Sequence, residues 1–77
     1  MSDLELLRCN AVAVEVRHLT EGHRYAFHYV EGEDGRGELS CPQLLQNDEA
    51  NHSAYFWIAD AYRFAHAHAL KAGKIDP

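Results

Sequence analysis

Two stretches in the first half of the chain alternate apolar and polar residues at the spacing of a β-strand. In residues 12–18 a β-branched residue recurs at every second position, at Val12, Val14 and Val16. Residues 23–31 place large aromatic residues at the same spacing. A tight loop centred on Thr20 and Glu21 pairs the two stretches so that all the large residues share one face. The expected partners are Val16 with Tyr25, Val14 with Phe27 and Val12 with Tyr29.

A turn signal and a third strand follow. Glu33-Asp34-Gly35 is typical of a hairpin loop, because Asp-Gly accepts a positive φ angle. This loop predicts a strand over residues 36–41, which Pro42 ends because proline cannot donate to a sheet ladder. Residues 4–10 fit either a helical turn or an early strand. The expected opposite pairs are Tyr29 with Leu39 and Phe27 with Cys41.

The second half of the chain carries apolar residues at helical spacing. Asn47 is the expected N-cap, with Asp48 and Glu49 opposing the positive end of the helix dipole, and Ser53 is the rival cap. From Asp48 to Ala72 the helix measures about 37 Å at 1.5 Å per residue. Its apolar face is expected to consist of Ala50, Ala54, Trp57, Ile58, Ala61, Phe64, Ala65 and Ala72.

These elements predict an α+β fold in one small domain, residues 1–77: a three-stranded antiparallel β-meander packed on one long C-terminal α-helix (βββα). Small alanines on the helix let the bulky sheet residues approach closely. The helix is longer than a strand of about 25 Å, so we expect it to overhang the sheet. Either Leu4, Leu6 and Leu7 fold back over the excess, or a second copy of the chain covers it. We expect a homodimer, formed through the helix or through a sheet edge.

The net charge of the chain argues against two classes of binding partner. The net charge is −5 and the seven basic residues are scattered, which argues against nucleic acid and against anionic membranes. No apolar run approaches the roughly 20 residues needed to span a bilayer. The acidic N-terminus lacks the basic region of a signal peptide, so we expect a cytoplasmic protein whose Cys9 and Cys41 are free and largely buried.

The order of a meander followed by a helix resembles, in outline, double-stranded-RNA-binding domains and small DNA-reading βββα modules. Those RNA binders carry basic residues at the start of the helix, whereas residues 47–51 of this chain read Asn-Asp-Glu-Ala-Asn. An outline shared without its binding residues implies no function.

Six histidines are the enriched titratable residues. His66 and His68 lie about 200° apart on a helix and cannot chelate together. His18 and His23 are expected to face each other at the mouth of the first hairpin, but no spacing supplies a third ligand. His68 falls on the apolar helix face, where we expect a core histidine. No serine or cysteine lies in a nucleophile motif, and acidic residues surround the glycines of 32–37. We therefore assign no catalytic, cofactor-binding or metal-ligating residue.

Two surfaces are candidates for binding a protein partner. Phe56, Arg63 and Leu70 line up on the outer side of the predicted helix, with Trp57 at its overhang, and interfaces favour aromatic residues and arginine. Glu33 and Asp34 mark the acidic hairpin tip. The main hypothesis is a non-enzymatic interaction or regulatory module that acts through the helix surface or a sheet edge. The alternatives are an acidic inhibitor or nucleic-acid mimic, of the kind small phage proteins use, acting through residues 31–38, and a histidine-based metal or small-ligand binder.

Overall fold

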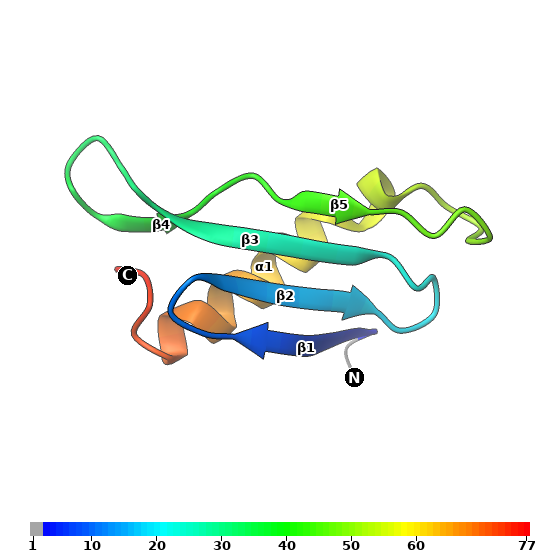
Figure 1. The fold of residues 1–77 in the computed structure, drawn as a ribbon, viewed down its shortest axis with the longest axis horizontal. Helices are drawn as coiled ribbons and strands as arrows, with labels where there is room; N and C mark the ends of the chain where they lie inside the picture. The colour runs from blue at the N-terminus through cyan, green and yellow to red at the C-terminus, as the bar shows by residue number, and fades with distance from the viewer. Residues whose placement is uncertain (1–2) are drawn as a thin grey trace.

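The computed structural model describes residues 3–77 and has two layers, an antiparallel sheet and one helix that crosses a single face of it (Figure 1). The α+β prediction is confirmed, although the sheet has more strands than expected. Of the predicted domain, Met1 and Ser2 lie outside the described residues. The elements in chain order are β1 (Leu4–Cys9), β2 (Ala13–His18), β3 (Arg24–Glu31), β4 (Gly37–Leu39), β5 (Gln43–Leu45), the short 3-10 helix η1 (Ala54–Trp57) and α1 (Ile58–Lys71).

The strand order is β1-β2-β3-β4, and β5 pairs with β3 along the same edge as β4. The register follows the predicted alternation in the middle of the sheet. The confirmed opposite pairs are Val16 with Tyr25, Val14 with Phe27 and Tyr29 with Leu39.

Two of the predicted pairs are wrong. The side chain of Asn10 accepts the backbone N–H groups of Val12 and Ala13, at 2.8 and 3.0 Å, so Val12 belongs to the β1–β2 turn and is 66% exposed. At the other edge β4 ends at Leu39, and the chain pairs with β3 again only in β5, so Cys41 is exposed. Pro42 lies between the two strands, where a missing N–H interrupts the ladder.

The ambiguous residues 4–10 contain strand β1, which pairs with β2. The register shifts between Leu6 and Arg8, the signature of a β-bulge. A bulge breaks the period of two, and this is why the alternation is unreadable in the sequence.

The helical segment begins later than predicted. The hydroxyl of Ser53, the rival cap, accepts the N–H of Tyr55 at 3.1 Å, and η1 leads directly into α1. The 14 residues of α1 measure about 21 Å, so the expected overhang is absent. Ala50 lies in a loop, and Ala72 follows α1 as an exposed C-cap.

The core confirms the predicted size match between the layers. Val14, Val16, Tyr25 and Phe27 from the sheet are fully buried against small residues of the helical segment. Those small residues are Ala54, Ala61, Ala65 and Ala69. The packing lets the Tyr25 hydroxyl donate to the carbonyl of Ala54 at 2.6 Å, which ties the sheet to the start of η1.

Both cysteines are free, as predicted, but only Cys9 is partly buried. Across residues 3–77, α1 and η1 fall short of the length and apolar character of a membrane-spanning helix.

Candidate functional site

The loop before η1 lies beside the β2–β3 turn, at the right-hand end of the view in Figure 1. The ring of His52 in this loop contacts those of Phe56 and Trp57, and Tyr55 precedes these two in η1. We call this cluster, His52, Tyr55, Phe56 and Trp57, the aromatic end. Tyr55 is 70% exposed and Phe56 is 60% exposed. Large aromatic residues with this much exposure lose apolar burial, so their position on the surface needs an explanation.

The aromatic rings form a continuous row that leads from the surface to the interior. The rings of His52 and Phe56 stack at 4.4 Å, and Phe56 meets Trp57 edge-on at 4.7 Å. Trp57 in turn packs on the buried His18 at 4.3 Å. The row gives the exposed Phe56 a fixed orientation.

A buried carboxylate holds this row in place. Glu21 lies in the β2–β3 turn and is only 5% exposed. Its carboxylate accepts a hydrogen bond from Nδ1 of His52 at 2.5 Å and another from the N–H of Asn51 at 2.9 Å. The His52 hydrogen bond is the main cause that lowers the pKa of Glu21 below its ordinary value; burial opposes it. The carboxylate is therefore ionised at neutral pH and anchors the loop.

His23 also holds the loop that precedes η1. It is fully buried, its Nδ1 accepts the N–H of Asn47 at 3.0 Å, and its Nε2 donates to the carbonyl of His52 at 2.7 Å. The side chain of Asn47, the predicted helix cap, instead donates to the carbonyl of Glu21 at 2.8 Å. These bonds satisfy polar groups that would otherwise be buried unpaired, so the loop has one preferred conformation.

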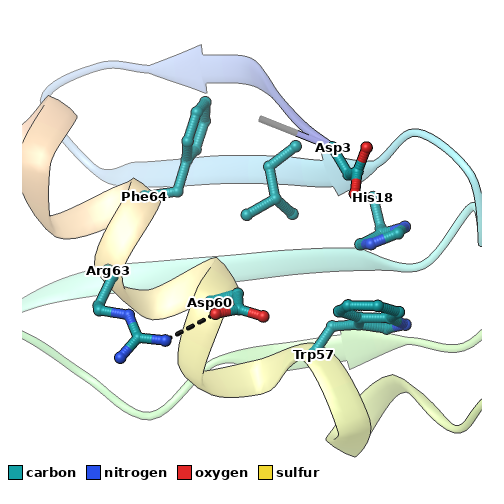
Figure 2. A pocket seen from close by; sticks show the side chains of 7 residues that line it. Asp3, His18, Trp57, Asp60, Arg63 and Phe64 are labelled. Carbon is teal, nitrogen blue, oxygen red and sulfur yellow. Dashed lines mark hydrogen bonds and ion pairs between the residues drawn. The ribbon is translucent and has the colours of Figure 1, made fainter. Parts of the chain in front are cut away.

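A pocket of about 410 Å³ opens beside the aromatic end, between the start of β1, the end of β2 and the first half of α1 (Figure 2). His18 and Trp57 stack at one end of it, and Phe64 lies at the other. Nδ1 of His18 accepts the N–H of Glu21 at 3.1 Å, while its buried Nε2 has no hydrogen-bond partner among residues 3–77. The full lining is Asp3, Leu4, His18, Trp57, Asp60, Arg63 and Phe64.

The structure brings together three of the interface residues expected from the sequence. Phe56 contacts Trp57, and Trp57 shares the pocket with Arg63, whose guanidinium donates to Asp60 at 2.6 Å. Leu70 lies near the far end of α1, so it does not join them.

Glu33 and Asp34 are exposed, as expected for a hairpin tip. The β3–β4 loop that carries them lies at the opposite end of the sheet from the aromatic end (Figure 1). The two candidate surfaces are therefore separate.

Sequence reasoning missed Tyr55, His52 and Glu21. The run Tyr55-Phe56-Trp57 was a usable signal, because three consecutive aromatic residues cannot all face the core of one helix. The burial of Glu21 was not predictable from the sequence, because a glutamate next to a glycine in a turn is usually exposed to solvent.

His18, His23 and His52 serve packing and loop anchoring. His18 and His23 do face each other across the first hairpin, joined by a backbone bond of 2.9 Å, but their ring nitrogens bind backbone groups or are buried. Within residues 3–77 no three His, Cys, Asp or Glu side chains converge closely enough to hold a metal ion. His68 is half-buried against Phe64 at 4.6 Å and is not the core residue that we expected.

Taken together, the aromatic end and the pocket offer exposed aromatic area in a fixed geometry beside the carboxylate of Asp3 and the ion pair of Asp60 with Arg63. No family model matches the chain, and no curated protein or solved structure matches it significantly.

Proposed function

We propose that this chain is a non-enzymatic interaction module of the cytoplasm, and that the aromatic end with its adjoining pocket binds a protein partner. The observation that carries the proposal is the exposure of Tyr55 and Phe56, at 70% and 60%, in η1, directly after a loop that the buried Glu21 holds. Aromatic residues are enriched in interfaces and dominate their binding energy. A surface that is already ordered also loses less entropy on binding.

The pocket favours a basic side chain as the anchor of that partner. Trp57 and Phe64 supply aromatic surface for an aliphatic stem, and the carboxylate of Asp3 supplies negative charge for a cationic head, whereas that of Asp60 is already paired with Arg63. A guanidinium or ammonium group over an aromatic face gains cation–π attraction in addition. The exposed Asp48 and Glu49 on the neighbouring loop and the net charge of −5 add long-range attraction for a basic segment.

A comparative pull-down tests this proposal. The immobilised chain and its Phe56→Ser variant are incubated with extract of the source cells, and the retained proteins are quantified by mass spectrometry. We expect a partner with a basic surface segment that the wild-type chain retains and Phe56→Ser releases. The amount of partner retained should also fall as the salt concentration rises, because salt screens the attraction between the acidic chain and the basic segment.

Two further variants act as controls. Leu70→Ser changes an exposed apolar residue on the same helical segment, away from the aromatic end, and should retain the partner. A double variant, Glu33→Lys with Asp34→Lys, removes the acidic tip and should still retain the partner, weakened only by the smaller net negative charge of the chain. A partner lost only with the double variant would overturn the proposal in favour of an acidic inhibitor that acts through residues 31–38.

A further inference from the structure

The edge strand β1 has a sequence that can pair with a second copy of itself. β1 ends the strand order, and no other described strand pairs with its outer edge (Figure 1). The edge of a sheet is a template on which another strand can pair. Leu6 and Leu7, at the middle of β1, are 38% and 40% exposed.

Charged side chains occupy the face of β1 that lies away from α1. Glu5 forms an ion pair with Arg17 of β2, and Arg8 forms another with Glu15 at 2.8 Å. Both pairs are formed by residues that are opposite each other in the sheet. Opposite residues of an antiparallel pair share a face, so Glu5 and Arg8 lie on the same side.

The bulge at Leu7 makes this possible. In a regular strand, residues three apart point to opposite faces. The extra residue between Leu6 and Arg8 shifts the alternation by one, so that Glu5 and Arg8 share the outer face, while Leu4 and Cys9 share the helix side.

We propose that β1 pairs antiparallel with β1 of a second copy of this chain, in the register that sets Leu6 opposite Leu7 of the copy. The same register sets Glu5 opposite Arg8 of the copy and Leu4 opposite Cys9 of the copy. The pair of Glu5 with Arg8 and the pair of Leu4 with Cys9 then match in face, and the leucine pair matches in chemistry. A twofold axis perpendicular to the sheet relates the copies, so both helices lie on one side of a continuous sheet.

Charge complementarity identifies the occupant as a second copy. Four strands meet at the centre of the dimer: β2 and β1 of one chain, then β1 and β2 of the copy. Their outer faces carry, in that order, Glu15, Arg8, Glu5 of the copy and Arg17 of the copy, so the sign of the charge alternates from each strand to the next. Adjacent strands lie about 4.8 Å apart, which brings each charge within reach of an opposite one. At the centre of the pairing, Leu6 and Leu7, which are both exposed in one copy, cover those of the other copy, and Leu6 lies on the helix side because its partner in β2 is the buried Val16.

Sedimentation equilibrium at tens of micromolar tests the proposal. The wild-type chain should sediment at about twice its mass of 8.7 kDa. Leu7→Asp places a charge in the leucine pair and should sediment at the mass of one chain. Leu70→Asp, on α1 with a similar exposure of 37%, should remain a dimer.

Charge reversal tests the register itself. Glu5→Arg and Arg8→Glu each place like charges opposite each other in a homodimer, so each variant alone should be monomeric. An equimolar mixture should form a heterodimer, because every cross-strand pair between the two variants is again of opposite sign. Circular dichroism confirms that each variant is folded. A wild-type monomer at all concentrations would overturn the proposal, as would a dimer that persists in Leu7→Asp or charge variants that fail to dimerise when mixed.

Discussion

The carboxylate of Glu21 and Nδ1 of His52 lie 2.5 Å apart and join two loops that are 31 residues apart in the chain. The bond fixes His52, and His52 supports the ring of Phe56 by stacking. The exposed aromatic surface therefore depends on a buried charge in the β2–β3 turn. This dependence makes the candidate site testable without knowledge of its partner.

Glu21→Gln should loosen the aromatic end. The amide keeps the size of the side chain but removes the charge that His52 and Asn51 bind, and charge-assisted bonds are the stronger ones. We expect a lower urea midpoint and a changed emission of Trp57, the single tryptophan, in the folded state. Glu49→Gln, at an exposed position of the neighbouring loop, is the control and should change neither. An unaltered midpoint in Glu21→Gln would show that the loop is held by other contacts.

The same carboxylate predicts a loss of stability in acid. Because the folded-state pKa of Glu21 is lowered, its contribution is present at neutral pH and disappears as the pH falls through that pKa. Urea unfolding of the wild-type chain between pH 7 and pH 3 should therefore show stability declining toward acid. Glu21→Gln should give a shallower decline over the same range. Parallel profiles would assign the acid sensitivity to other carboxylates.

Tyr25 predicts a loss of stability in alkali. Burial raises its pKa to about 12, with the charge of Glu21 as a second cause. A raised folded-state pKa gives stability that is present below the ordinary tyrosine pKa of about 10 and is lost as the pH rises toward 12. Tyr25→Phe should cost about 1–3 kcal/mol at neutral pH, because the carbonyl of Ala54 loses its hydrogen bond.

The alkaline profile of Tyr25→Phe should also be flatter between pH 10 and pH 12, although not flat. Tyr29, whose pKa is raised to about 12 as well, remains in the variant. Denaturant unfolding at each pH measures both effects. An equally steep alkaline loss in the variant would contradict the assignment to Tyr25.

Ala61→Leu should overpack the layer between helix and sheet. Ala61 is fully buried in the same cluster as Phe27, so extra methylene groups should cost about 1–3 kcal/mol. Ala59→Leu makes the same change at an exposed position of α1 and should leave thermal stability nearly unchanged. Equal melting temperatures for the two variants would show that α1 faces the sheet differently.

The strands with regular alternation were predictable from the sequence. The spacing of Val14, Val16, Tyr25 and Phe27 determined the central register, because a slip by one residue would turn the large side chains into solvent. β1 was not predictable, because its bulge destroys the period that identifies a strand. β5 is three residues long and follows a proline, too short for any periodicity.

The helix start shows how local signals compete. Asn47, Asp48 and Glu49 form a plausible N-terminal signature, and Ala50 happens to fall on the apolar spacing. In the structure the side chain of Asn47 is committed to the β2–β3 turn. That contact is made across 26 residues of chain, and single-sequence patterns do not report on it. Because the helix was predicted to begin too early, Tyr55 and His52 were not recognised as neighbours of Phe56 and Trp57, which were named from the sequence as candidate interface residues.

The central claim, that the aromatic end binds the partner, is tested most directly by the dissociation constant of the captured partner. Isothermal titration should compare the wild-type chain with Phe56→Ser at one fixed salt concentration. We expect binding weaker by about 30-fold or more in Phe56→Ser, the loss typical of a central aromatic residue in an interface. Equal dissociation constants for the two proteins, with binding lost instead in the variant that carries Glu33→Lys and Asp34→Lys, would contradict the claim.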